Sequence, residues 1–352
     1  MFFEHVRSDR GCVSYVIGCE KTRAALIVDP DLGQVDRYLA LASTHGLRFH
    51  YLLDTHTHAD HFSGARLLAA RLGLPIVMHR LAPAPFVDLR VEDGEALIVG
   101  ELRVAIHHTP GHTSDSICAV VGEHLLTGDT LLLGATGRTD LPSGDAEQLH
   151  ESLFGRLLRL DGGLLVHPAH NYKNLPATTL EEQKTKNARL QQRERAAFVT
   201  MMRNLDLEMP DHLTEALRTN CTGGRTVEQI IREAAARVSF MSMGELSRRL
   251  ASGAPGVVIL DVREADAYLA GHIPGALHLP RGQIELRVDS VLPDPTVRVL
   301  VTCELGKIST IAAATLRDMG FSGAIALDGG VKAWREAGYP LEKGKGDVPR
   351  LQ

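Results

Sequence analysis

One short stretch constrains this chain more than any other. Residues 55–61, THTHADH, place three imidazoles and one carboxylate within seven residues. The apolar run 51–53 before it predicts a buried strand, and residues 63–70 after it predict the start of a helix. The stretch is therefore expected on a strand-to-helix loop, where side chains can converge on one point. Imidazole and carboxylate are usual protein ligands of transition metals, so we predict a metal site here; the alternative is a histidine-rich surface loop.

Length and composition limit the remaining possibilities. A chain of 352 residues suggests about two domains, and 44% hydrophobic with 23% charged residues is typical of a soluble globular protein. A net charge of -5 gives no reason to expect nucleic acid or an anionic membrane as a partner. Apolar runs such as 24–28 are far shorter than the roughly 20 residues that cross a bilayer. The amino-terminal residues show no basic segment followed by an apolar one, so no signal peptide is expected.

The cysteines argue for a reducing compartment. There are five, Cys12, Cys19, Cys118, Cys221 and Cys303, an odd number without a CxxC pair. This pattern predicts no disulfide framework and favours a cytoplasmic location. We expect four of them to be buried apolar residues or incidental thiols, whereas Cys303 has a distinctive setting.

Strand-like apolar runs dominate the first half of the chain, with one clear helical segment at residues 35–45. Short apolar runs bounded by turn residues predict strands. They fall at 12–17, 24–28, 51–53, 75–78, 102–107, 116–121 and 123–127. Runs of strands with interspersed helices predict two stacked sheets covered by helices.

Three further polar motifs follow predicted strands in this half. They are TPGHT at 109–113 with His112, TGDT at 127–130 with Asp129, and HPAHNY at 167–172 with His170. Taken singly, each would more often be a satisfied polar residue in a loop. Because ligands at several strand ends can meet at one edge of a sheet core, four such motifs together favour a metal site.

These motifs, in this order, resemble the metallo-β-lactamase superfamily. The resemblance implies an αββα sandwich with its metal site at one sheet edge. Within the superfamily, GRTD at 137–140 and LEEQKTKNARL at 180–190 resemble the persulfide dioxygenases, also called sulfur dioxygenases. The resemblance covers about residues 1–220.

The superfamily resemblance implies two alternative metal arrangements. Persulfide dioxygenases hold one Fe(II) per domain, here through His56, His112 and Asp129, and two imidazoles with one carboxylate leave positions open for a persulfide and dioxygen. The spare residues His58, Asp60, His61 and His170 then orient the ligands. In the two-zinc arrangement of glyoxalase II, His56, His58 and His112 hold one metal, Asp60, His61 and His170 the other, and Asp129 bridges them. The sequence by itself leaves both open.

Three residues are candidates for substrate contact. Arg138 could bind a substrate carboxylate or fix the active-site loop, and the alternative is a structural ion pair with Asp140. Tyr172 and Lys173 follow a ligand-type histidine and are expected to line a glutathione pocket.

The second half has a different pattern, in which predicted strands alternate with predicted helices. Residues 256–263 and 298–303 predict buried strands, and residues 309–319 predict a helix. Such alternation predicts a parallel sheet with helices on both faces. Ligands of such sheets bind beyond the carboxyl ends of the strands, where Cys303 lies. The backbone N–H groups and helix start of the loop 303–309 can stabilise a thiolate and lower its pKa; the alternative is a buried cysteine that ends a strand.

The surrounding motifs resemble the rhodanese family. They are LDVRE at 260–264, GHIPGA at 271–276 and LDGGVKAW at 327–334. The resemblance implies that Cys303 is the sulfurtransferase nucleophile, which carries sulfane sulfur as a persulfide. Its loop continues with Glu304, Leu305, Gly306, Lys307, Ile308 and Ser309. Rhodanese loops often carry Arg at the second and sixth positions, where this chain has Glu304 and Ile308, so we expect weak thiosulfate binding or preference for another persulfide donor.

The sequence thus predicts a fusion of two enzymes. Residues 1–221 form a metallo-β-lactamase-like dioxygenase domain with a helical tail, 222–239 a linker, and 240–352 a rhodanese domain. The resemblances imply oxidation of glutathione persulfide by O₂ to sulfite and glutathione, and sulfur transfer between thiosulfate or a persulfide and glutathione. They also raise homodimerisation as an expectation. The alternative is a two-zinc thioester hydrolase of the glyoxalase II type with a rhodanese-like sensing or docking module.

Overall fold

The computed structural model describes residues 1–9, 11–210, 212–253 and 256–344. The chain divides into two compact units, Met1–Gly224 and Arg225–Gln352. Within the predicted rhodanese range, residues 254, 255 and 345–352 lie outside the described residues. Each unit builds its own core, and each is described by itself.

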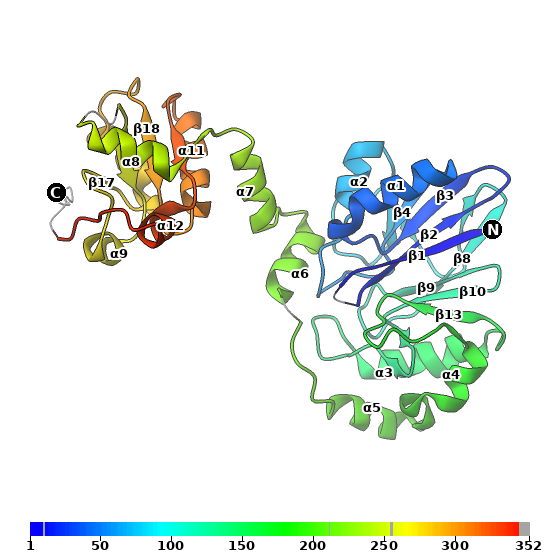
Figure 1. Ribbon diagram of the computed structural model, residues 1–352. Helices are drawn as coiled ribbons and strands as arrows, with labels where there is room; N and C mark the ends of the chain where they lie inside the picture. The colour runs from blue at the N-terminus through cyan, green and yellow to red at the C-terminus, as the bar shows by residue number, and fades with distance from the viewer. Residues whose placement is uncertain (10, 211, 254–255, 345–352) are drawn as a thin grey trace. The chain divides into compact units, whose positions relative to one another are not determined.

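Two six-stranded sheets form the centre of the first unit (Figure 1). The first sheet has the order β1 (Phe2–Arg7), β2 (Val13–Gly18), β3 (Ala24–Val28), β4 (Arg48–Leu53), β5 (Ile76–His79) and β6 (Leu89–Val91). The second has the order β14 (Thr178–Thr179), β13 (Leu165–Pro168), β10 (His124–Gly128), β9 (Ile117–Val121), β8 (Leu102–His108) and β7 (Ala96–Val99). A two-stranded ribbon adds β11 (Leu131–Leu132) and β12 (Ala135–Thr136). The strands β1, β6, β7, β11, β12 and β14 were not predicted from the sequence.

Alternation along the strands produces the layers of this unit. Neighbouring side chains of a strand point to opposite faces, and here both faces are covered. Ile17 packs between the two sheets, whereas Val16 packs under the helices on the outer face of the first sheet. In the second sheet Leu126 points into the space between the sheets and Leu125 toward the helices outside. Strands that are buried on both sides explain why the sequence shows continuous apolar runs.

The helices of the first unit cover the outer faces of the sheets. They are α1 (Val35–His45) and α2 (Ala65–Leu72) on the first sheet, and α3 (Ala146–His150), α4 (Leu180–Lys186) and α5 (Arg195–Arg203) on the second. Helix α6 (Leu213–Thr222) ends the unit. This is the predicted αββα sandwich, and the expectation is confirmed.

The direction of the strands brings the polar motifs together. Strands β8 and β10 are both antiparallel to β9, and β13 is parallel to β10, so β8, β10 and β13 end at the same edge. Strand β13 extends to Pro168, so the first two residues of the HPAHNY motif belong to the strand, and His167 pairs in register with Leu126. His170 still lies just past the strand.

The second unit is a single parallel sheet between two helical layers. Its strand order is β15 (Phe240–Met241), β19 (Ile325–Leu327), β18 (Val299–Thr302), β16 (Val258–Asp261) and β17 (Leu277–His278), and every pair is parallel. One face packs against α7 (Val227–Ala235), α10 (Ile284–Val291) and α11 (Lys307–Asp318). The other packs against α8 (Met243–Ala251), α9 (Ala265–Ala270) and α12 (Gly330–Glu336). The predicted parallel α/β domain is confirmed.

Two further expectations can be compared with the structure. All five cysteines are unpaired, as the spacing predicted.

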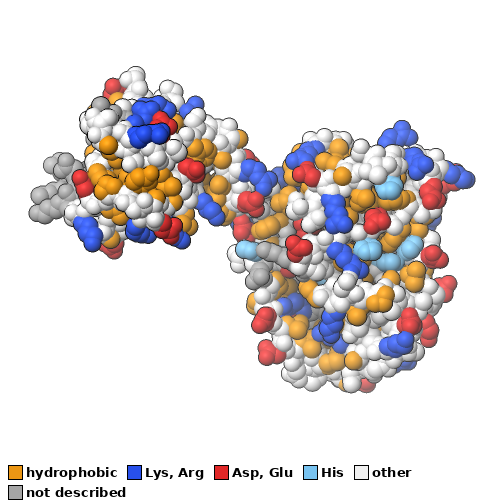
Figure 2. All heavy atoms as spheres, in the orientation of Figure 1, with side chains coloured by type: hydrophobic (Ala, Val, Ile, Leu, Met, Phe, Trp, Pro, Cys, Tyr) orange, Lys and Arg blue, Asp and Glu red, His pale blue; other side chains and the backbone are white. Residues whose placement is uncertain are grey.

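Among the described residues, no helix combines the length and apolar character needed to cross a membrane. On the face of the molecule shown in Figure 2, basic and acidic side chains are interspersed.

Candidate functional site

Three predicted ligands converge at the edge of the sandwich. His56, His112 and Asp129 follow β4, β8 and β10, and all three side chains are buried. Their candidate ligand atoms all lie within 4.8 Å of one another. The Oδ2 atom of Asp129 is 3.6 Å from Nε2 of His112 and 4.0 Å from Nε2 of His56. Atoms that share one transition metal lie about 3 to 3.5 Å apart, since each bond is about 2.1 Å long, so a small contraction would close the site.

Hydrogen bonds hold both imidazoles with Nε2 facing this cluster. Nδ1 of His112 donates to the backbone oxygen of Arg138 at 2.8 Å. Nδ1 of His56 lies 3.0 Å from the hydroxyl of Thr55, and that hydroxyl donates to Asp29 at 2.9 Å. Because the single hydroxyl proton is used on Asp29, Nδ1 of His56 must be the donor. In both rings the proton therefore sits on Nδ1, and Nε2 keeps the lone pair that a metal requires.

The charge distribution of the cluster also suits a cation. Nε2 of His56 is buried and makes no hydrogen bond within the described part of the chain. Burial, reinforced by the neighbouring His58, lowers the pKa of His56 well below its usual value and keeps the ring neutral. Burial would raise the pKa of Asp129, but the facing histidines, His170 foremost, outweigh it and keep the pKa low. Two imidazole Nε2 atoms and one carboxylate are thus presented together.

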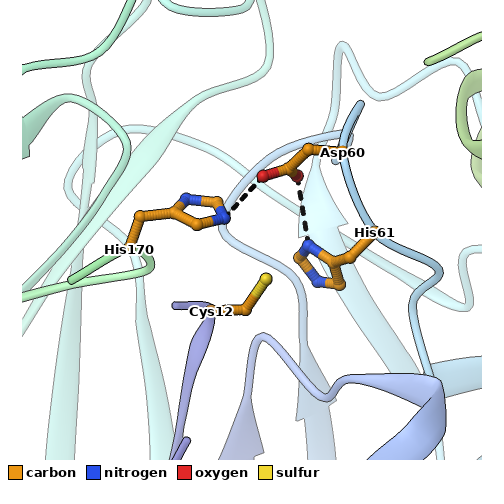
Figure 3. Close-up of side chains that lie close together, drawn as sticks. All are labelled: Cys12, Asp60, His61 and His170. Carbon is orange, nitrogen blue, oxygen red and sulfur yellow. Dashed lines mark hydrogen bonds and ion pairs between the residues drawn. The ribbon is translucent and has the colours of Figure 1, made fainter. Parts of the chain in front are cut away.

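A second cluster lies beside the first and is formed by Cys12, Asp60, His61 and His170 (Figure 3). Oδ2 of Asp60 is 2.6 Å from Nε2 of His170, and Oδ1 is 3.2 Å from Nδ1 of His61. The other nitrogen of His170, Nδ1, is 2.7 Å from Oδ1 of Asp129. His170 therefore connects the two clusters through its two ring nitrogens.

Cys12 is the member of this cluster that sequence reasoning missed. It was expected to be an incidental buried thiol, but it comes just before β2 and its backbone pairs with His170. Burial opposes ionisation of the thiol, yet hydrogen bonds from His170 and His61 outweigh it and lower the pKa of Cys12 to about 7. No local motif marks this cysteine, since its neighbours in the cluster lie about 50 and 160 residues further along the chain.

His58 takes a different place from its neighbours in the THTHADH stretch. Its Nε2 atom lies 3.2 Å from Oδ1 of Asp29 and 3.8 Å from Oδ1 of Asp54. The structure therefore groups His58 with two buried carboxyl groups rather than with His56 and His112. Burial raises the pKa of Asp54 to about 7.

The three candidate substrate residues line one cavity with the metal cluster. The cavity has a volume of about 710 Å³ and is lined by His112, Asp129, Arg138, Tyr172 and Lys173, among others. The Tyr172 ring stacks on the ring of His170, with centroids 5.3 Å apart. The Arg138 guanidinium binds both carboxylate oxygens of Asp140 at 2.7 Å and also donates to the backbone oxygen of Glu208. These contacts are those expected if Arg138 forms a structural ion pair with Asp140 and fixes the active-site loop.

The two motifs that carried the dioxygenase resemblance fix one wall of this cavity. A side chain at Gly137 would collide with the backbone oxygen of Asp129, so the GRTD loop requires glycine there. In the 180–190 segment, Asn187 donates to the backbone oxygen of Ala135 at 2.9 Å, and Arg189 donates to that of Thr136. Arg189 itself lines the cavity, a position that the sequence analysis did not single out.

Asn220, near the carboxyl-terminal end of the first unit in sequence, binds the backbone of the THTHADH loop. This buried amide in α6 donates at 2.8 Å to the backbone oxygens of both His58 and His61. Its oxygen accepts from the backbone N–H of Ser63 at 3.1 Å. An asparagine in a helical tail carries no sequence signal for such a contact, and it was missed.

The cysteine site of the second unit is more local. Cys303 follows β18 directly and is buried, and the backbone N–H of Ser309 donates to its sulfur at 3.2 Å. Ser309 lies in the first turn of α11, so the helix start faces the sulfur as the sequence predicted. Gly330 packs on this loop with a φ of +66°, and a Cβ there would lie 2.7 Å from the backbone oxygen of Glu304. This contact explains the second glycine of LDGGVKAW.

Fold and sites together define a metallo-β-lactamase-type metalloprotein joined to a rhodanese-like unit. The model of the metallo-β-lactamase superfamily matches residues 7–170, and that of the rhodanese-like domain matches residues 242–337. The human protein named persulfide dioxygenase ETHE1, mitochondrial, is 36% identical over 214 residues, which cover 60% of this chain and 84% of that protein. Hydroxyacylglutathione hydrolase of Anaeromyxobacter dehalogenans is 39% identical over 175 residues, 49% of this chain and 66% of that protein.

Solved structures agree with these relatives. The crystal structure of ETHE1 from Myxococcus xanthus matches with a TM-score of 0.62 at 36% identity, covering 64% of this chain and all of that one. A metallo-β-lactamase from Staphylococcus aureus covers 93% of this chain and 98% of that one at 23% identity and a TM-score of 0.60, which shows the fold alone. The chain belongs to the ETHE1 family of the metallo-β-lactamase superfamily and carries a carboxyl-terminal rhodanese-like domain. These relationships support a role as an enzyme of sulfur metabolism that binds metal through a His/Asp site.

Proposed function

We propose that the first unit is an Fe(II)-dependent persulfide dioxygenase that oxidises glutathione persulfide with O₂ and water to glutathione and sulfite. The observation that carries this proposal is the cluster of His56, His112 and Asp129, which offers two imidazole Nε2 atoms and one carboxylate within 4.8 Å of one another. This donor set with open positions is typical of non-haem Fe(II) oxygenases. The relationship to ETHE1 supports the choice of reaction.

The residues of the cluster fit such an ion. His56, His112 and Asp129 would hold it, and the orphaned Nε2 of His56 would gain a partner. When bound, the ferrous ion supplies open positions where dioxygen and a persulfide sulfur can react together. Asp29 and the backbone of Arg138 fix the two rings, and His170 orients Asp129.

The cavity beside the cluster supports a glutathione-sized substrate. Its volume of about 710 Å³ falls within the range usual for small-molecule sites. Lys173 offers a positive charge for a substrate carboxylate, and Tyr172 offers an aromatic face beside His170. Arg138 acts as a positioning residue, because its guanidinium is bound to Asp140.

For the second unit we propose sulfur transfer through Cys303, with a persulfide or thiosulfate as donor and glutathione or sulfite as acceptor. The backbone N–H of Ser309, which donates to the sulfur at the start of α11, supports Cys303 as the nucleophile. We also propose the division into residues 1–221, 222–239 and 240–352, in which helix α7 of the middle segment packs on the second unit. A homodimer is a further proposal. The unpaired cysteines favour a cytoplasmic location.

Metal analysis combined with oxygen uptake tests the dioxygenase proposal. Protein purified without added metal should contain about one iron per chain and consume oxygen when glutathione persulfide is added. The His112→Ala variant should lose both the iron and the oxygen uptake. Two zinc ions per chain without oxygen uptake would contradict the proposal.

A second candidate function, a two-zinc thioester hydrolase, is favoured by the second cluster. Asp60, His61 and His170 could hold another metal, with Cys12 as an additional soft ligand. The similarity to a hydroxyacylglutathione hydrolase points the same way. Hydrolysis of a glutathione thioester by the two-zinc form, without oxygen uptake, would support this function.

A further inference from the structure

The cavity beside Cys303 has walls in which opposite charges are already paired. It has a volume of about 560 Å³. The charged residues that line it are Arg263, Glu264, Arg281 and Glu304. Two positive and two negative groups face the same space, so the cavity is not a simple site for anions.

Glu304 follows the nucleophile directly and lies between two arginines. Its Oε2 atom accepts from Arg263 at 3.0 Å, and its Oε1 atom accepts from Arg335 at 2.9 Å. The carboxylate is only partly exposed, with 42% of the side chain accessible. The backbone oxygen of Glu304 also accepts from the N–H of Lys332. Glu304 is thus held in place at the cavity wall.

The arginines of the wall are also engaged elsewhere. Arg263 binds the buried carboxylate of Asp261, with Nη2 and Oδ2 2.7 Å apart, and donates to the backbone oxygen of Gly271. Arg281 donates to Glu285 at 2.8 Å. A small dianion would have to compete with a bound carboxylate at either guanidinium, Glu304 and Asp261 at Arg263 or Glu285 at Arg281, and it would face the charge of Glu304 as well.

The remaining residues that line the cavity are apolar and suit the apolar part of an organic ligand. Val262, Ala267, Ile308 and Ile311 contribute apolar wall, and Ile308 is 52% exposed. Leu305, in the same loop, is 56% exposed. Apolar walls with paired charges can accept a molecule that carries both an ammonium and carboxylates, since each end can pair with a wall group of opposite sign.

We propose that Glu304 sets the donor specificity of the Cys303 site, excluding small sulfur dianions such as thiosulfate in favour of a zwitterionic organic persulfide such as glutathione persulfide. This inference rests on the proposed sulfur transfer through Cys303. The Cys303 thiolate attacks the outer sulfur of the donor R–S–SH and forms a new sulfur–sulfur bond. The donor S–S bond breaks, its electron pair leaves with R–S⁻, and the proton stays on the transferred sulfur. No separate oxidant is needed.

Charge variants at Glu304 test this inference. Loading of one sulfur atom on Cys303 is followed by intact-protein mass spectrometry with either thiosulfate or glutathione persulfide, and kcat/KM is measured for each donor in the full chain. The native protein should favour glutathione persulfide. Glu304→Arg should raise the thiosulfate-to-persulfide ratio of kcat/KM by about tenfold or more, and Glu304→Gln should raise it less. Thermal unfolding confirms that both variants remain folded.

Two controls separate the possible failures. Glu336→Gln removes one negative charge from α12, where Glu336 pairs with Lys332 away from the cavity lining, and it should leave the ratio unchanged. Cys303→Ser should load no sulfur from either donor. If the native protein loads none, the proposed sulfur transfer itself is wrong. If it loads sulfur but prefers thiosulfate, or if both Glu304 variants keep the native ratio, the specificity inference is wrong while sulfur transfer stands.

Discussion

The metal cluster and the cysteine site are built in opposite ways. The cluster takes one residue from each of three loops, and its orientation depends on hydrogen bonds from residues as distant in sequence as Asp29 and His170. The cysteine site takes its nucleophile and its stabilising N–H from a single strand-to-helix turn, Cys303 to Ser309. A convergent site is sensitive to the packing of the whole unit, whereas a local site depends chiefly on one turn and on what packs against it.

The largest expected effect is the complete loss of one activity, sulfur loading, without a change in the other, oxygen uptake. Cys303→Ser should abolish sulfur loading and leave iron content and oxygen uptake unchanged, because the metal cluster and the cysteine loop belong to different compact units. Mass spectrometry and an oxygen electrode measure the two activities in the same sample. A large fall in oxygen uptake would show that the sites are coupled.

The reciprocal change should act on the metal cluster alone. His112→Ala removes one of three ligands, and we expect iron affinity to fall more than about 100-fold, beyond the range usual for residues that only orient a ligand. Oxygen uptake with glutathione persulfide should fall with it, and sulfur loading on Cys303 should persist. Iron that stayed bound at native stoichiometry would exclude His112 as a ligand.

Removal of a distant support should weaken only the convergent site. Asn220→Ala deletes the donors to the backbone oxygens of His58 and His61, so the loop that presents His56 loses its anchor. We expect iron affinity to fall about 10- to 100-fold, measured by competition with a chelator. The exposed Asn204→Ala serves as the control and should bind iron like the native protein.

The cysteine loop should be sensitive to the glycine that packs on it. Gly330→Ala places a Cβ against the backbone oxygens of Cys303 and Glu304 in a left-handed conformation, and we expect a loss of about 1 to 3 kcal/mol in the unfolding free energy of the second unit. Gly338→Ala is the matched control, since its φ of +76° is similar but no atom lies within 4 Å. Denaturant unfolding should show a clearly larger loss for Gly330→Ala; equal losses would show that the close contact is unimportant.

The smallest effect concerns acid stability of the histidine-rich first unit. Burial, aided by the neighbouring His124, lowers the pKa of His167 from 6.5 to about 4. Between these values the unfolded chain binds a proton that the folded chain excludes, so the free energy of unfolding falls as the pH drops from 6.5 to 4, by at most about 3 kcal/mol.

Hydrogen exchange of β13 peptides at pH 4.5 and pH 7 measures this acid sensitivity. In the His167→Gln variant, hydrogen exchange of β13 should depend less on pH than in the native protein. The His50→Gln variant, at an exposed position, should behave like the native protein. An unchanged pH dependence in His167→Gln would assign the effect to other groups.

Much of the fold could be predicted because its signals are local. Runs such as 24–28 are apolar on both faces, which predicts strands covered on both sides, and the strand–helix alternation after residue 240 predicts a parallel sheet. Among the missed strands, β6 and β7 have only three and four residues, whereas β1 has six, of which Glu4, His5 and Arg7 interrupt the apolar pattern. Pairing with longer neighbours, rather than their own sequence, defines such short strands.

The sequence by itself named the candidate residues of both sites. The ordered histidine and aspartate motifs, the cysteine at the end of a predicted strand and the family resemblances together predicted His56, His112, Asp129 and Cys303. Only the tertiary structure decided how the other groups are used. It turned His58 toward Asp29, brought Cys12 beside His61 and His170, and set Glu304 between Arg263 and Arg335. The physical reason is that side-chain direction and partner choice depend on how distant segments pack, and a one-dimensional pattern does not contain that information.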